Sequence, residues 1–205
     1  FDYLKPKGIG YLGAGVSGGE EGARHGPSIM VGGSKEQWHN AEAVLTAIAA
    51  KFNGESCCAY LGEGGAGHFV KTIHNGIEYG DMQMIAEVYG VMRDGLGMSP
   101  SECADVFKEW NKGPLNSYAQ GFAVIAKASE ENGWALPLAT IAKIWRAGCI
   151  IRSRFLDQMS AAYAKGGNVN LLVVPDFVSL MKDAHPSLRK VVAAAAVGEF
   201  PMICL

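Results

Sequence analysis

The spacing of hydrophobic positions changes near residue 65. Before it, the apolar runs are short and bounded by glycines, which predicts strands at residues 9–12, 28–31 and 57–61. Between the second and third strands, apolar side chains recur every three to four positions from residue 34 to 52. Ser34 and Gln37 form a capping box at the start of this helix, and Asn53-Gly54 closes it. Residues 1–64 are therefore expected to be the end of an α/β sheet.

After residue 65 the pattern is helical throughout. A central helix is predicted from about residue 67 to 93 and, at 1.5 Å per residue, should be on the order of 40 Å long. Turns are expected at residues 111–114 and 165–168. Further helices are predicted at residues 100–110, 117–131, 137–164, 175–182 and 186–197. The chain is thus expected to be mainly α, with an all-helical domain over residues 65–205.

The central helix carries one polar face. Lys71, His74, Asn75 and Glu78 fall at positions i, i+3, i+4 and i+7, which are neighbours on a helix, while the other faces are apolar. Such a row can be an ordinary solvated face with a core histidine. A base, an acid and two neutral hydrogen-bonding groups that follow a glycine-rich helix start are, however, typical of an acid/base site.

The segment 13–18, Gly-Ala-Gly-Val-Ser-Gly, matches the dinucleotide motif GxGxxG. The motif needs a helix of some length and then a strand, whereas residues 19–27 have no apolar periodicity and a strand follows at once. We therefore expect an irregular loop, whose backbone N–H groups and Ser17 hydroxyl can face a carboxylate or phosphate. A plain glycine-rich connection between two strands is the alternative.

Net charge, the length of the apolar runs and the cysteine content exclude some kinds of binding partner and site. The 205 residues carry a net charge of −2 and no long run of Lys or Arg, so nucleic acid is not expected as the partner. The apolar runs are too short to span a bilayer, and a cytoplasmic protein is expected. Five cysteines without a CxxC spacing indicate buried free thiols and no metal site.

Three segments together resemble the 6-phosphogluconate dehydrogenase family: residues 15–30, residues 65–83 and residues 145–153. The Ser-Gly-Gly loop and the Gly-x-x-x-Lys-x-x-x-Asn helix also occur in other β-hydroxyacid dehydrogenases. The continuation His-Asn-Gly-Ile-Glu-Tyr-Gly-Asp at residues 74–81 and the long helical part are more specific. The resemblance implies the helical domain of the β-hydroxyacid dehydrogenase type, preceded by a remnant of the nucleotide-domain sheet.

The resemblance also implies an activity, the NADP-dependent oxidative decarboxylation of 6-phosphogluconate to ribulose 5-phosphate and carbon dioxide in the pentose phosphate pathway. Lys71 would be the general base, and Glu78 the acid that protonates C1 of the enediol. The substrate would be held by Ser17, Gly18 and Gly19 at its carboxylate, by His74 and Asn75 at hydroxyl and carboxylate groups, and by Tyr79 at its phosphate. A homodimer is expected through the helical domain.

The chain departs from the family pattern in three places. We expect three parts to be missing: most of the dinucleotide domain, a middle part of the helical domain near Ser117 and a C-terminal tail. The NADP-binding site and several phosphate ligands would be missing with them. The chain alone is therefore expected to be inactive. Two alternatives stay open: a non-catalytic helical module that dimerises or binds an anion, and a dehydrogenase for another β-hydroxyacid.

Overall fold

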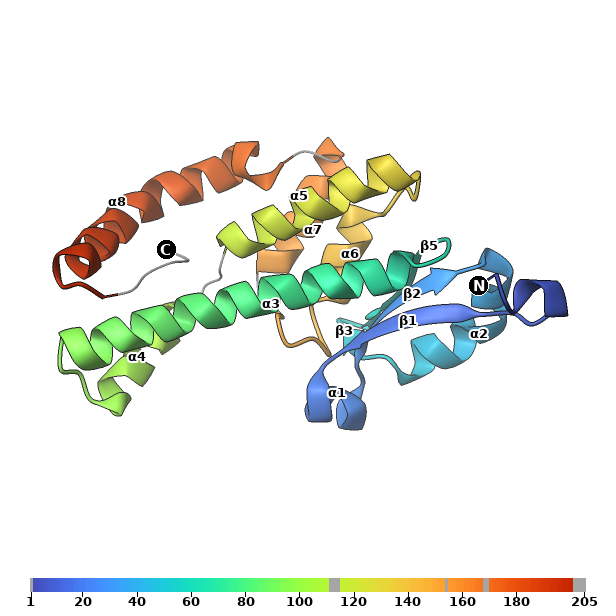
Figure 1. Ribbon diagram of the computed structural model, residues 1–205, viewed down its shortest axis with the longest axis horizontal. Helices are drawn as coiled ribbons and strands as arrows, with labels where there is room; N and C mark the ends of the chain where they lie inside the picture. Colours follow the sequence, from blue (N-terminus) through green and yellow to red (C-terminus); the bar gives the residue numbers. More distant parts are fainter. Residues whose placement is uncertain (1, 111–114, 154, 168–169, 201–205) are drawn as a thin grey trace.

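The computed structural model describes residues 2–110, 115–153, 155–167 and 170–200. Its first part has the order η1 (Lys5–Lys7), β1 (Leu12–Ser17), α1 (Gly19–His25), β2 (Ser28–Gly33), α2 (Lys35–Ile48), β3 (Lys51–Phe52), β4 (Glu55–Ser56) and β5 (Cys58–Gly62). The second part consists of α3 (Ala66–Gly90), η2 (Val91–Gly95), α4 (Pro100–Trp110), α5 (Leu115–Asn132), α6 (Leu138–Ile144), α7 (Phe155–Gly166), η3 (Leu171–Val173) and α8 (Pro175–Val197). The predicted fold class, mainly α after a small α/β part, is confirmed (Figure 1).

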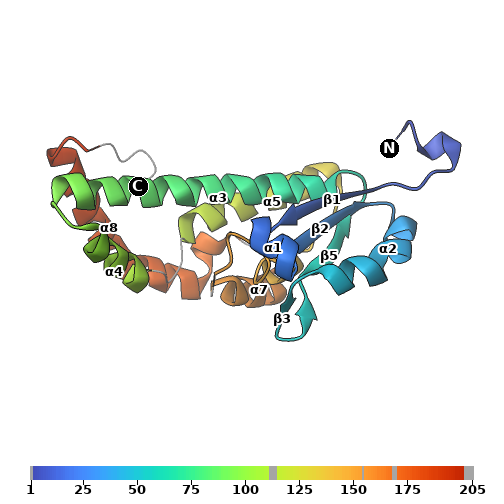
Figure 2. The same ribbon diagram turned by 90° about the horizontal axis from the view of Figure 1, so that it is seen from below.

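The sheet has the strand order β1-β2-β5, with β1 antiparallel and β5 parallel to β2. Helices α3 and α2 lie on its opposite faces (Figure 2). On the α2 face, Trp38 stacks on Tyr60 with ring centroids 6.2 Å apart and packs in a cluster with Ile29 and Val31. Every residue of β2 is buried, as expected for the central strand of a sheet covered on both sides.

Glycines bring α3 against the sheet at main-chain distance. A Cβ on Gly67 would lie 2.4 Å from the carbonyl oxygen of Met30 and 2.6 Å from the nitrogen of Gly32. A Cβ on Gly15 would lie 2.3 Å from the Cβ of Lys71. Because real Cβ atoms do not come so close to other atoms, only glycine fits at these positions. The glycines of β1 and β2 therefore serve helix–sheet packing.

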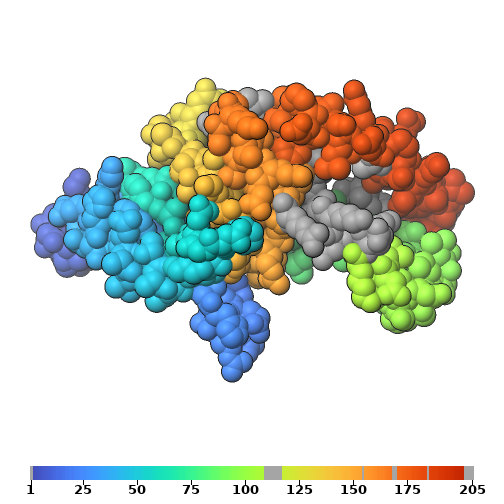
Figure 3. Space-filling model, turned by 180° about the vertical axis from the view of Figure 1, so that it is seen from behind, coloured from blue at the N-terminus to red at the C-terminus, as the bar shows by residue number. Residues whose placement is uncertain are grey.

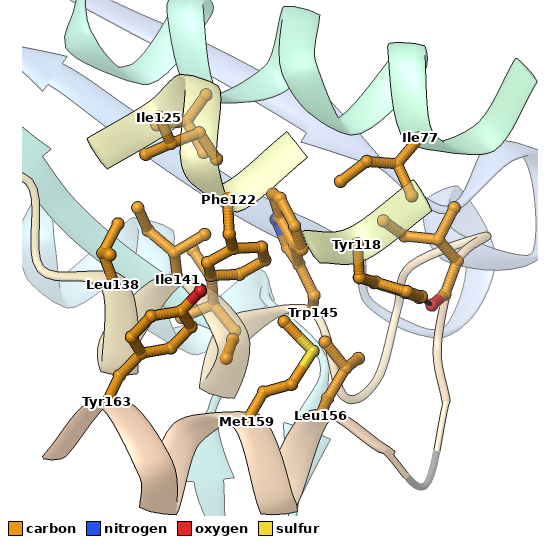
Figure 4. Close-up of a cluster of buried hydrophobic side chains, with 14 of the residues drawn as sticks. Ile77, Tyr118, Phe122, Ile125, Leu138, Ile141, Trp145, Leu156, Met159 and Tyr163 are labelled. Carbon is orange, nitrogen blue, oxygen red and sulfur yellow. Dashed lines mark hydrogen bonds between the residues drawn. The ribbon is translucent and has the colours of Figure 1, made fainter. Parts of the chain in front are cut away.

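The main core lies under α3, where α5, α6 and α7 meet (Figure 4). Trp145 is its largest fully buried side chain. The Trp145 ring meets the edge of Phe122 at 5.3 Å, and Phe122 stacks on Tyr163 at 5.2 Å. Met30, Cys57 and Leu61 from the sheet belong to the same cluster, as do Ile77, Tyr118, Ile125, Leu138, Ile141, Leu156 and Met159.

Three predictions for the N-terminal part are corrected. The first strand, predicted at residues 9–12, begins only at Leu12 and runs through the glycine motif to Ser17. Residues 19–25 form a short helix, α1, in place of an irregular loop. Apolar periodicity could not reveal α1, because only Gly22 of its residues is buried. Figure 3 shows this segment, in blue, standing out from the body of the molecule. Helix α2 also ends earlier than predicted, at Ile48.

Two predictions for the helical part are also corrected. The helix expected over residues 137–164 is two helices, α6 and α7, separated by a turn region that begins at Trp145. The two helices expected at 175–182 and 186–197 are one, α8, with Pro186 inside it. Since α8 is mostly exposed, water can satisfy the carbonyl that Pro186 leaves without a donor. The turn predicted at 111–114 lies outside the described residues.

Candidate active site

Three segments far apart in sequence meet at the polar face of α3: the end of β1, the first half of α3 and the turn region after α6. Ser17 comes from β1, and Cys149 comes from the turn region. The turn region is tied to the sheet by Ser28, whose N–H donates to the Gly148 carbonyl and whose hydroxyl donates to the Ile144 carbonyl, both at 2.7 Å. This anchoring fixes the position of Cys149 against α3.

His74 lies at the centre of this cluster and is completely buried. Its Nε2 is 2.9 Å from the Ser17 hydroxyl oxygen and 2.8 Å from the Cys149 sulfur. The rings of His74 and Trp145 pack in an edge-to-face arrangement, with their centroids 5.4 Å apart. The Ile150 N–H donates to the Ser17 oxygen at 3.4 Å. The imidazole is therefore held from two elements besides its own helix.

The other ring nitrogen of His74 faces the polar row of α3. Nδ1 is 3.3 Å from the Lys71 amine and 3.3 Å from the Asn75 amide oxygen. The Lys71 amine also donates to the Asn75 oxygen, and a Glu78 carboxylate oxygen lies 3.8 Å from Nδ1. The four residues predicted from helix periodicity, Lys71, His74, Asn75 and Glu78, thus form one connected cluster.

Burial sets the protonation states in the cluster. It lowers the pKa of the Lys71 amine, while the nearby Glu78 carboxylate opposes the shift in part. Burial, aided by the charge of Lys71, lowers the pKa of His74 to about 4, so the imidazole is neutral near pH 7. A lysine whose pKa is lowered and that contacts a neutral imidazole is suited to accept a proton.

Gly18 and Gly19 follow Ser17 directly and lie at the start of α1. Both have positive φ, 131° and 56°, in the region that favours glycine. A Cβ on Gly18 would lie 2.6 Å from the Gly148 carbonyl oxygen, so this position is also closed to larger residues. The predicted residues Ser17, Gly18 and Gly19 therefore lie together beside the turn region that carries Cys149.

Tyr79 is the predicted site residue that the structure leaves out of the cluster. It is 69% exposed and lies one turn beyond Asn75 on the flank of the polar face. Cys149 and Trp145 are the residues that sequence reasoning missed, although their segment carried part of the family resemblance. Nothing in that segment's pattern indicates that the thiol faces His74, because its contact depends on the turn after α6.

In the described residues, the glycine motif does not form a dinucleotide-binding site. Gly13 and Gly15 face α3, and the positions of their missing Cβ atoms lie within 3 Å of His68 and Lys71 side-chain atoms. Their backbone is therefore covered by the helix and closed to a pyrophosphate. The prediction that this GxGxxG match is misleading agrees with this geometry. In the described part of the chain, no helix is both long and apolar enough to cross a bilayer.

Two buried groups give the stability opposite dependences on pH. His74 titrates near 4 when folded and near 6.5 when unfolded, so its contribution of about 3 kcal/mol is present above pH 6.5 and lost as the pH falls to 4. Burial raises the pKa of Asp81 to about 6, so folding gains from its protonation as the pH falls from 6 toward 3.8. The two contributions largely cancel in the native protein.

We expect substitution to separate these two contributions. Urea unfolding of Asp81→Asn should show a loss of about 2 to 3 kcal/mol between pH 7 and 4.5, because only the lowered pKa of His74 still acts. His74→Gln should gain stability over the same range from the raised pKa of Asp81. Other carboxylates act equally in both variants and cancel in the difference. Equal pH profiles for the two variants would show that His74 is not buried in its neutral form.

Comparison with known proteins covers the whole chain. The sequence model of the 6-phosphogluconate dehydrogenase C-terminal domain matches residues 67–119 and 114–205, and that of the NAD binding domain of 6-phosphogluconate dehydrogenase matches residues 1–62. The decarboxylating 6-phosphogluconate dehydrogenases of Bacillus licheniformis and Mus musculus are 35% and 34% identical to it, over 100% and 98% of this chain and 67% and 64% of their own lengths.

A solved structure gives the same result. The 6-phosphogluconate dehydrogenase of Plasmodium falciparum, studied in its apo form and in complex with its cofactor NADP+ and its substrate 6-phosphogluconate, superposes with a TM-score of 0.93 at 28% identity. The match covers 99% of this chain and 66% of that one. This chain thus spans about two thirds of the length of its relatives.

Part of the difference in length is internal. The alignment to the Bacillus licheniformis protein extends over 311 positions for the 205 residues of this chain, so that relative carries about a hundred further residues inside the matched region. The two matches to the C-terminal domain overlap at residues 114–119, which places these further residues of the relatives near the start of α5. With both domain models and relatives above 30% identity covering its length, the chain belongs to the 6-phosphogluconate dehydrogenase family.

Proposed function

We propose that this chain carries the substrate-binding and acid/base half of a decarboxylating 6-phosphogluconate dehydrogenase, which forms ribulose 5-phosphate and carbon dioxide with NADP as oxidant. The observation that supports this most is the contact of Lys71, whose pKa burial lowers, with the neutral His74, beside Asn75 and Glu78. A base and an acid on one helix face, next to the Ser17 loop, are what the reaction requires.

The chemistry assigns one proton to each of two residues. Lys71, in its neutral form, takes the proton of the C3 hydroxyl as C3 is oxidised by loss of hydride. The product is a β-keto acid, whose carboxylate leaves as carbon dioxide because the ketone accepts the electron pair. Glu78 then protonates C1 of the enediol to give ribulose 5-phosphate. Lys71, now protonated, lies close enough to Glu78 for the carboxylate to raise its pKa.

The remaining predicted residues bind and orient the substrate. Ser17, Gly18 and Gly19 would hold its carboxylate, and His74 and Asn75 its hydroxyl and carboxylate groups. Tyr79, exposed on the flank of α3, would reach the phosphate. The backbone of the glycine motif is covered by α3, so NADP would have to be bound elsewhere. The division into residues 1–64 and 65–205, a cytoplasmic location and a homodimer remain proposals of the same kind.

A second candidate function follows from the missing internal segment. A chain without the roughly hundred residues that the Bacillus licheniformis relative carries near the start of α5 could serve as a non-catalytic helical module that dimerises or binds an anion. We expect such a module to dimerise without binding NADP. A different β-hydroxyacid substrate is the third candidate, and Tyr79 in the sequence together with the long helical part disfavours it.

Calorimetric titration of residues 1–205 with 6-phosphogluconate tests the proposal. We expect saturable binding that Ser17→Ala weakens roughly tenfold, since a hydrogen bond to a charged group is worth about 1.5 kcal/mol or more. Ser99→Ala, an exposed helix cap far from the cluster, is the matched control and should bind like the native chain. Gluconate, which lacks the phosphate, measures what the phosphate contributes.

Each outcome decides between the candidate functions. Binding that is weakened by Ser17→Ala but not by Ser99→Ala supports the substrate site. A folded chain that binds no 6-phosphogluconate contradicts the proposal and favours the helical module. Equal binding by the native chain and Ser17→Ala would also contradict it, because the anion would then lie elsewhere. NADP binding to this chain would count against the module.

A further inference from the structure

We propose that Cys149 is a positioning residue, which together with Ser17 holds His74 in the tautomer with the proton on Nδ1, so that the ring presents an N–H group to Lys71. The thiol and the hydroxyl come from different elements and converge on the same nitrogen, Nε2, at 2.8 and 2.9 Å. The tautomer itself does not depend on the proposed function. Only the use of neutral Lys71 as a base rests on that function.

The environment of Nε2 favours this nitrogen as a hydrogen-bond acceptor. A hydroxyl and a thiol each carry one proton to donate. The Ser17 oxygen already accepts from the Ile150 N–H, so in the chain without substrate its own proton is available to Nε2. Burial raises the pKa of Cys149 to about 11, so the sulfur keeps its proton near neutral pH. With two donors against it, Nε2 is the unprotonated nitrogen of the neutral ring.

The environment of Nδ1 leads to the same tautomer. It lies 3.3 Å from the Asn75 amide oxygen and 3.8 Å from a Glu78 carboxylate oxygen, and both atoms are acceptors. The amide orientation is supported by the Lys71 amine, which donates to the same Asn75 oxygen. An unprotonated Nδ1 would place three acceptors together at a buried ring. A proton on Nδ1 places one donor among these acceptors and leaves Nε2 for Ser17 and Cys149.

The tautomer affects the state of Lys71. The amine lies 3.3 Å from Nδ1, and an Nδ1–H group can donate to its lone pair only when the amine is neutral. The charged ammonium would instead face that N–H with a proton of its own. The titratable groups around His74 are Lys71 and Glu78 on α3 and Cys149 from the turn region. Cys149 therefore favours the base form of Lys71 through the imidazole, without contact with substrate.

Nitrogen-15 NMR of histidine in residues 1–205 tests the inference without substrate or cofactor. The native His74 should show a pyrrole-type Nδ1 and a pyridine-type Nε2. In Cys149→Ala, one donor to Nε2 is lost, and the ratio of the Nδ1–H to the Nε2–H tautomer should fall about fivefold, as expected for one net hydrogen bond. Cys149→Ser keeps a donor and should restore the ratio. Cys58→Ala, a buried thiol in β5, is the matched control and should change nothing.

The titration of the Lys71 amine gives the second readout, since a merely structural thiol would not move it. Its midpoint should rise in Cys149→Ala and return in Cys149→Ser. A native His74 protonated on Nε2 overturns the inference, and this result needs no variant to fold. An unchanged tautomer ratio and an unchanged Lys71 midpoint in folded Cys149→Ala overturn it as well. None of these outcomes depends on 6-phosphogluconate binding, so the proposed function is judged separately.

Discussion

Replacing Gly67 by alanine is expected to destabilise the protein by about 3 kcal/mol or more. The added Cβ would lie 2.4 Å from the Met30 carbonyl oxygen, 2.6 Å from the Gly32 nitrogen and 2.8 Å from the Val31 carbonyl carbon. All three are main-chain atoms of the central strand, so no side-chain rotation can relieve the overlap. The helix or the sheet must move, and strain of this kind exceeds the usual cost of an extra methyl group in a core.

Gly76 provides the matched control on the same helix. No atom lies within 4 Å of the Cβ that would be added there, and the residue is exposed. Gly76→Ala should stabilise the protein by about 0.5 to 1 kcal/mol, because alanine favours the helix. Urea unfolding followed by circular dichroism measures both variants. If Gly67→Ala were as stable as the native protein, the main-chain contact between α3 and β2 would not exist.

Replacing Trp145 by alanine is expected to cost about 3 to 5 kcal/mol, the range for a large aromatic removed from a core. The indole is completely buried between His74 and Phe122, and its Nε1–H donates to the Met30 sulfur at 3.4 Å. Figure 4 shows the ring beside Phe122 in the core. Its loss opens a cavity that touches the sheet, α3 and α5 together. Few neighbours can move into that space without breaking another contact.

Trp134 is the control for this substitution. It is only partly buried and packs on Phe69 with ring centroids 5.4 Å apart, so Trp134→Ala should cost roughly 1 to 2 kcal/mol. The difference between the variants is measured by urea unfolding at pH 7. A cost below about 2 kcal/mol for Trp145→Ala would mean that the core closes around the gap.

The polar cluster could largely be predicted because it is local. Lys71, His74, Asn75 and Glu78 lie within eight residues of one helix, so the helical repeat alone places them on one face. Ser17 also lies at the cluster, as the family resemblance implied. Cys149 could not be placed from the sequence, because its contact with His74 depends on how the turn after α6 is anchored to the sheet by Ser28.

The errors in the fold have a common physical cause. The glycines of β1 were interpreted through local backbone freedom, whereas their role is set by a helix more than fifty residues later. The break after Ile144 was missed because apolar residues continue through it, among them the buried Cys149 and Ile151. Pro186 was taken as a helix boundary, but exposure lets α8 continue through it. In each case a tertiary contact or solvent decided the outcome.

The glycine contact between α3 and the sheet has a consequence for redesign of the protein. Because the separation of Lys71 from the strand that ends in Ser17 is set by main-chain atoms, the size of core side chains does not determine it. A library that keeps Gly15, Gly32 and Gly67 could randomise the aromatic core and still preserve the distance between the loop and the base. Selection for new stability or solubility could then proceed independently of selection for the geometry of the site.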